Sequence, residues 1–180
     1  GVLGLRFDAY ALADRNPAGL LLYALLAIGP IEELAKLLPF LVVILRFDEF
    51  DEPIDGIIYA SFIALGFAAV ENVRYLEFLT WPEALARGFA GPVVHIAFAS
   101  VWGYYVGRAW LRRQGVLPAI AVSFVVTALL HGVYDFLVIA MPLAALPAAA
   151  LLVLCLWIWR TVLHKELQER AKGAGRQADS

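Results

Sequence analysis

Five long apolar stretches dominate the chain and predict five membrane-spanning helices. A helix needs about 20 apolar residues to cross a bilayer, and each stretch comes near or exceeds that length. The stretches do not alternate polar and apolar residues as barrel strands do. The pattern therefore predicts an all-α, polytopic transmembrane helical bundle of about five spans, at residues 18–45, 55–79, 89–111, 117–141 and 143–160.

Short polar or turn-forming segments separate these stretches. The first stretch contains Gly29-Pro30 and Pro39, so it predicts either one long kinked span or a broken one. The chain starts at Gly1 and its single Met is Met141, so we expect that further residues precede Gly1. We predict three regions, namely an extracytoplasmic N-terminal stub at 1–16, a transmembrane catalytic bundle at 17–160 and a polar cytoplasmic tail at 161–180.

Composition excludes several classes of protein. Apolar residues make up 62% of the chain, charged residues 17%, and the net charge is -2. A soluble globule, a nucleic-acid-binding protein and a disordered chain are therefore excluded. Cys155 is the single cysteine, so an internal disulfide and a cysteine-based zinc finger are excluded as well.

Basic residues distribute unevenly between the two ends of the predicted spans. By the positive-inside rule, the richer side is cytoplasmic and the C-terminus lies there. Most of the five tryptophans fall near predicted span ends, where an interfacial belt explains them. The tryptophans are Trp81, Trp102, Trp110, Trp157 and Trp159. The basic residues of the cytoplasmic side are Arg46, Arg108, Arg112, Arg113, Arg160, Lys165, Arg170, Lys172 and Arg176, and those of the opposite side are Arg6, Arg15 and Arg87.

Polar residues inside the spans are the informative ones, because a charge at mid-bilayer costs about 2.5–3.5 kcal/mol. Their presence on four spans favours one shared site. Estimated depths place most of them in one layer of the outer half of the bilayer. They are Glu32, Glu33 and Lys36, then Glu71, Asn72 and Arg74, then His95, and finally His131 and Asp135.

Helical spacing indicates which of these side chains can meet. Lys36 lies one turn from both Glu32 and Glu33, so it can neutralise either carboxylate. His131 and Asp135 share one face of their helix. Each residue also has a structural interpretation: a Lys36-paired helix lock for the glutamates, an ion pair with Arg74 for Glu71, and helix-orienting hydrogen bonds for the histidines.

Carboxylates and imidazoles in a dry pocket are the parts of a hydrolase that activates water. A glutamate can accept a proton from water while a histidine holds that water, and the second histidine with Asp135 can donate to the oxyanion. No serine has a histidine at a local spacing that marks it as a nucleophile. We expect no cofactor, with Zn²⁺ bound by Glu, His and His as the alternative, because H-E-x-x-H spacing is absent.

The ordered motifs resemble the PrsW family of intramembrane proteases, which is related to the CAAX-prenyl proteases and the bacteriocin-immunity group. The motifs are Glu32-Glu33-x-x-Lys36, Asp55-Gly56, Gly66-Phe67-x-x-x-Glu71-Asn72, His95 and His131-x-x-x-Asp135, over about residues 30–136. The resemblance implies a glutamate-dependent intramembrane endopeptidase that cleaves a single-pass membrane protein such as an anti-sigma factor. It implies a bacterial cytoplasmic membrane, with Glu32, Glu33, Glu71, His95, His131 and Asp135 as catalytic residues and Lys36 and Asn72 as supporting ones.

Two other classes of function fit the same residues. Intramembrane Glu, His and Asp side chains also mark ion paths, so a proton-coupled carrier is one alternative. A catalytically silent binding or immunity protein is the other, because function depends on the site rather than on the fold. The expected partners are a single-pass transmembrane substrate and the lipid bilayer, and no nucleic acid.

Overall fold

The computed structural model describes residues 9–76 and 79–141, together with six isolated positions between 147 and 161. Within these residues every regular element is a helix, which confirms the all-α class. In chain order they are α1 (Ala9–Arg15), α2 (Pro17–Tyr23), the π-helix η1 (Ala24–Ile28), α3 (Gly29–Val42), the 3₁₀-helix η2 (Ile44–Arg46), α4 (Pro53–Tyr75), α5 (Trp81–Arg112) and α6 (Val116–Ala140).

Three of the predicted spans are long apolar helices in the structure. Within the described residues, α4, most of α5 and α6 are long and apolar enough to cross a membrane. The first predicted span is one helical rod over residues 17–42, in which α2, η1 and α3 follow one another without a loop. Pro30 comes just after the π-helix η1, so the residue that lacks an N–H lies where the regular α-helical hydrogen bonding is interrupted. The fifth predicted span lies largely outside the described residues.

Two segments that the sequence assigned to non-helical regions are helical. Part of the predicted stub forms α1, which packs against α2 and α6. The predicted connection at 80–88 is wrong, because α5 begins at Trp81. Pro82 falls in the first turn of α5, a position that suits proline because its fixed φ matches the helix. The longer helix places Arg87 on a rigid element.

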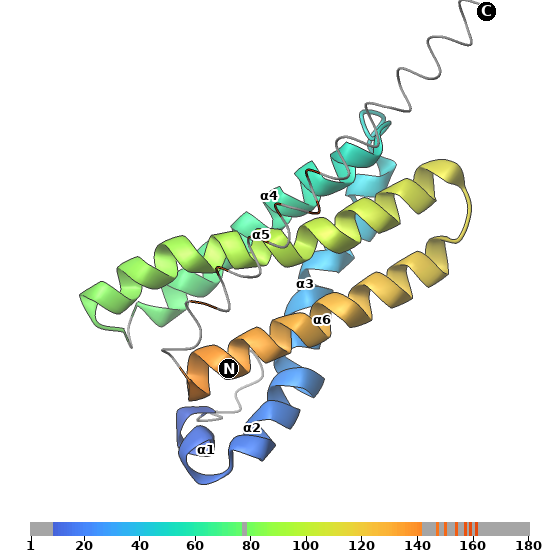
Figure 1. Cartoon of the computed structure of the whole chain (residues 1–180). Coiled ribbons are helices and arrows are strands. Elements are labelled where there is room, and N and C mark those ends of the chain that lie inside the picture. The colour runs from blue at the N-terminus through green and yellow to red at the C-terminus, as the bar shows by residue number, and fades with distance from the viewer. Residues whose placement is uncertain are drawn as a thin grey trace, which may run out of the picture.

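α4 and α5 form the closest helix pair and run side by side in opposite directions (Figure 1). Their backbones approach at Gly56 and Gly103, where a Cβ on either residue would overlap backbone of the other helix. Small residues permit such contacts between membrane helices. Phe40 of α3 and Trp102 of α5 fill the space beside this pair, with ring centroids 5.2 Å apart. Trp102 is 0% exposed, so the interpretation of this residue as interfacial is wrong.

α6 packs against α5 and α3, and it meets the first helical rod through two glycines. A Cβ on Gly29 would overlap the carbonyl oxygen of Ala128, and a Cβ on Gly132 would overlap the backbone of Ala24. The close approach sets the acidic turn of α3 directly against the polar face of α6. In Figure 1 α3 passes from α2 across α6 towards the α4 and α5 pair.

Candidate active site

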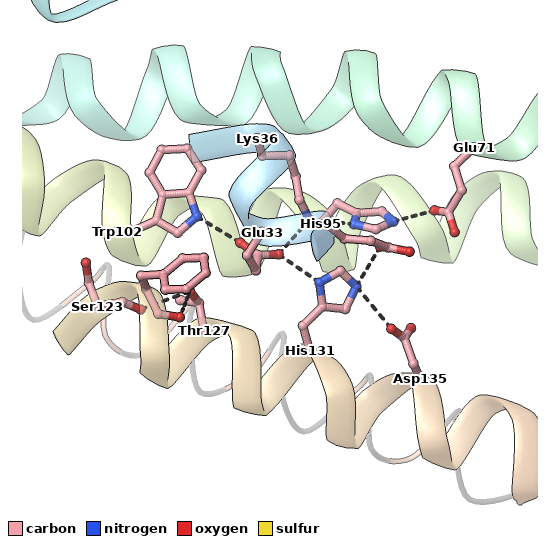
Figure 2. A network of polar contacts seen from close by, with 11 residues as sticks. Glu33, Lys36, Glu71, His95, Trp102, Ser123, Thr127, His131 and Asp135 are labelled. Atoms are coloured by element: carbon pink, nitrogen blue, oxygen red, sulfur yellow. Dashed lines mark hydrogen bonds and ion pairs between the residues drawn. The ribbon is translucent and has the colours of Figure 1, made fainter. Parts of the chain in front are cut away.

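The predicted polar residues from four helices converge on one network. Glu32, Glu33 and Lys36 come from α3, Glu71 from the last turns of α4, and His95 from the first half of α5. His131 and Asp135 come from the second half of α6. Figure 2 shows Glu33 between Trp102, Lys36 and His131, with Asp135 on the opposite side of the His131 ring.

Glu33 is the buried centre of the network and is 0% exposed. Its Oε1 accepts hydrogen bonds from Lys36 Nζ at 2.5 Å and from His131 Nδ1 at 2.7 Å. Its Oε2 accepts from the indole Nε1 of Trp102 at 2.8 Å. Three donors from three helices therefore hold this carboxylate, and its orientation is fixed.

Lys36 is also 0% exposed, and it pairs with Glu33 rather than with Glu32. Its ammonium lies 3.1 Å from His95 Nδ1 and 4.9 Å from the centre of the Phe67 ring. An ammonium can only donate, so His95 Nδ1 must accept. A buried charge of this kind requires compensation, which the Glu33 carboxylate provides.

His95 connects this centre to a second ion pair. Because its Nδ1 accepts from Lys36, its Nε2 carries the ring proton and donates to Glu71 Oε2 at 2.8 Å. Glu71 Oε1 accepts from Arg87 at 2.6 Å, and the guanidinium carbon of Arg87 lies 3.7 Å from the centre of the Tyr75 ring. The interpretation of Glu71 as a partner of Arg74 is therefore wrong, because its basic partner is Arg87.

The opposite tautomer holds at His131. Its Nδ1 must carry the proton, because Glu33 Oε1 is a carboxylate oxygen that can only accept. Its Nε2 then presents a lone pair towards Glu32 Oε2 at 3.4 Å and Asp135 Oδ2 at 3.7 Å. Both of these oxygens are buried and make no hydrogen bond within the described residues. Three acceptor atoms thus face one point with no donor among them.

The site has a closed side and an open side. The side chains of Glu33 and Lys36 are fully buried, whereas those of Glu32 and Asp135 are 19% and 20% exposed. Glu71 and Arg87 are also partly exposed. The Glu32 and Asp135 side chains are therefore partly exposed and the Glu33 side chain is not, although the facing oxygens Glu32 Oε2 and Asp135 Oδ2 are themselves buried.

Four hydroxyl side chains of α4, α5 and α6 are hydrogen-bonded within their own helices. Each of the four side chains donates to a main-chain carbonyl of its own helix, three or four residues earlier. The side chains are Ser61, Ser100, Ser123 and Thr127.

Sequence reasoning missed Trp102 and Arg87, and it included Asn72, which makes no hydrogen bond or ion pair to the network in the described part of the chain. Asn72 lies beside Gly91 of α5, where a built Cβ would be 3.6 Å from Asn72 Oδ1. Pro82 could have indicated that α5 begins earlier than predicted, and an earlier start would have placed Arg87 on this helix. Trp102 lies near the middle of the predicted span 89–111, and this position is the sequence signal that separates it from an interfacial tryptophan.

A divalent cation would find suitable ligand atoms at the same place. Glu32, His95 and His131 each offer one ligand atom, and these atoms lie within 4.8 Å of one another. The ligands come from three different helices, so metalloprotease spacing on a single helix is not needed. Hydrogen bonding by Glu33 to the far nitrogen of His131 is the arrangement that usually accompanies a metal-binding histidine.

Comparison with known proteins identifies similar chains. The family described as "PrsW family intramembrane metalloprotease" matches residues 4–161. A protein named Protease PrsW from Oceanobacillus iheyensis is 34% identical over 76% of this chain and 64% of its own length. The Geobacillus kaustophilus protein of that name is 34% identical, covering 77% of this chain and 62% of itself. For the Bacillus subtilis protein the values are 31%, 78% and 65%.

The chain therefore spans slightly less than two thirds of the length of these relatives. No solved structure matches it significantly.

Proposed function

The chain belongs to the PrsW family of intramembrane proteases, and from that premise we propose that it is an endopeptidase that activates water at Glu32, His131 and Asp135. The proposal is supported by three acceptor atoms, one from each of these residues, that lie close together on the Glu32 and Asp135 side of the His131 ring. A water molecule at that point would donate a hydrogen bond to two of them, which prepares it to lose a proton.

The two adjacent glutamates have different roles in this proposal. Glu33 has both oxygens engaged and no exposed surface, so it orients His131. Glu32 has a free oxygen and partial exposure, so it is the general base. This division assigns the role of the base to Glu32, a choice that the sequence left open.

Peptide hydrolysis then proceeds by proton movements among these groups. Glu32 Oε2 takes a proton from water as the water oxygen attacks the scissile carbonyl carbon, and later passes that proton to the leaving amine. His131 shares the proton through Nε2, and once protonated this nitrogen can donate to the oxyanion. Asp135 faces the same nitrogen and stabilises its protonated form.

The family description adds a metal, and the donor set fits one. Glu32, His131 and His95 would hold a divalent cation, after His95 releases one of its present hydrogen bonds. A bound cation would supply Lewis-acid polarisation of the water and the carbonyl. The meeting of ligand atoms and the orphaned carboxylate oxygens support this metal-dependent alternative, in which Glu32 would be a ligand instead of the general base.

The substrate we propose is a single-pass membrane protein, such as an anti-sigma factor, cleaved near its extracytoplasmic side. Glu71 and Asp135 stand in the last two turns of α4 and α6, at the helix ends that the basic-residue distribution places outside. The same distribution supports an integral protein of a bacterial cytoplasmic membrane with its C-terminus in the cytoplasm.

The test compares Glu32→Gln, Glu33→Gln and Glu49→Gln in the full chain, reconstituted with a panel of single-pass substrates. Glutamine keeps the size and removes the proton acceptor, so Glu32→Gln should lower kcat by about 10²–10⁴-fold with the fold intact. Glu49 is exposed and lies outside the network, so Glu49→Gln is the matched control and should cleave at the parental rate.

Parental cleavage by folded Glu32→Gln would overturn the assignment of the base. A folded parent that cleaves no substrate in the panel but moves protons across liposomes would overturn the proteolytic function and favour a carrier.

A further inference from the structure

We propose that Trp102 is a positioning residue that fixes the tautomer of His131 through Glu33. This inference rests on the proposed function, since it assigns Trp102 a role in preparing the proposed water-activating nitrogen. Trp102 is fully buried and has no contact with the open side of the site. It would therefore act through the hydrogen bond that it donates to Glu33.

The geometry of Glu33 makes the indole the deciding contact. Lys36 and His131 both bond to Oε1, so they leave the carboxylate free to turn about the axis of its side chain. Among the described residues, Trp102 alone holds Oε2, at 2.8 Å. With both oxygens held, the plane of the carboxylate is set, and Oε1 stays aimed at His131 Nδ1.

Acceptor oxygens lie beside both nitrogens of the His131 ring, which carries a single N–H proton in its neutral form. Glu33 attracts the proton to Nδ1, while Glu32 and Asp135 offer acceptor oxygens to Nε2 on the other side. Proton placement on Nε2 would remove the lone pair that the proposed chemistry needs. A fixed Glu33 favours Nδ1, because its bond is short and aligned whereas the other two distances exceed hydrogen-bond range.

Packing also holds the Trp102 indole in the orientation in which its N–H donates to Glu33. The Trp102 ring packs edge-on against Phe40 of α3, at 73° between the ring planes. Phe40 and Trp102 are both 0% exposed. A buried indole N–H needs a partner, and a tryptophan serving only to fill space would not need to direct that group to the carboxylate that orients a histidine.

The main experiment separates the N–H group from the shape of the ring. Trp102 is replaced by benzothienylalanine, which keeps the bicyclic shape and lacks the N–H, and separately by Phe. Nitrogen-15 NMR of the chelator-treated, lipid-reconstituted full chain then reports which ring nitrogen of His131 is protonated. The chain has three histidines, so replacement of each in turn assigns the signals.

We expect the parent to carry the His131 proton on Nδ1 and both Trp102 variants to move it towards Nε2. On a cleaved substrate, kcat should fall by about 10–100-fold with KM unchanged, the range typical of a lost orienting contact. Trp110→Phe is the matched control on the same helix, because Trp110 is partly exposed and outside the network. Phe40→Leu tests packing alone.

An unchanged tautomer in the benzothienylalanine protein would overturn the inference, and so would an equal shift in Phe40→Leu. The benzothienylalanine result decides the question even where Trp102→Phe fails to fold. Because the NMR measurement needs no turnover, it also decides the role of Trp102 where the parent cleaves none of the substrates, which is a failure of the proposed function alone.

Discussion

Replacement of Lys36 by Met tests whether the buried network behaves as one charge-balanced unit. Lys36 has no exposed surface and forms an ion pair with Glu33, a hydrogen bond with His95 and a contact with the Phe67 ring. Met has a similar length and no charge. The change therefore leaves the Glu33 carboxylate buried without its cation.

The expected cost follows from what remains around Glu33. Removing one partner of a buried ion pair costs about 3–5 kcal/mol. Trp102 and His131 still donate to Glu33 after the change, so we expect the lower end, about 3 kcal/mol of unfolding free energy. In a Glu33→Gln background no carboxylate is stranded there, and the cost of Lys36→Met should fall by about 1.5 kcal/mol or more.

Reversible unfolding in mixed micelles with rising mole fraction of denaturing detergent measures these four proteins in one double-mutant cycle. Arg74→Met is the control, because Arg74 is exposed and should change stability by no more than about 0.5 kcal/mol. A cost below about 1 kcal/mol for Lys36→Met would refute the reasoning. An equal cost in the parental and Glu33→Gln backgrounds would refute the coupling.

Two further outcomes follow from the helix contacts and from the acceptor cluster. Gly29→Ala should destabilise the fold by about 1–3 kcal/mol, because its Cβ would overlap the carbonyl oxygen of Ala128. Gly66→Ala is the control and should not destabilise it, because no atom lies within 4 Å of a Cβ built there. Equal unfolding midpoints for the two variants would contradict this prediction. Cleavage of a reconstituted substrate should survive exhaustive chelation, because Glu32 as the general base needs no cation. Loss of activity that added Zn²⁺ reverses would contradict this and would make Glu32 and His131 metal ligands.

Hydrophobic patterning alone determined the helical class and the three long spans. A bilayer imposes a fixed length and forbids unpaired backbone groups, so an apolar stretch of about 20 residues has few alternatives. The cost of charge in lipid also marked the residues of the network, since Glu33, His95 and His131 would not be tolerated there singly. These properties are local, so they can be predicted residue by residue.

The pairing of those residues was decided by the tertiary structure. Lys36 is one turn from both glutamates, and only the crossing of α3 over α6 at Gly29 sends it to Glu33 and leaves Glu32 on the open side. Glu71 has Arg74 one turn away, yet it pairs with Arg87 of the neighbouring helix. Spacing along one helix limits which contacts are possible, but helix packing selects among them.

Trp102 shows the same limit most clearly. Tryptophan is a residue type typical of a membrane interface, but Trp102 lies near the middle of the predicted span 89–111, and the packing of α5 against α3 buries it and directs its N–H to Glu33. An amphipathic ring can satisfy its polar group with headgroups or with a buried carboxylate, and the residue type alone does not distinguish the two. The sequence thus determined which polar groups must find partners in the membrane, and the approach of three helices decided which partners they found.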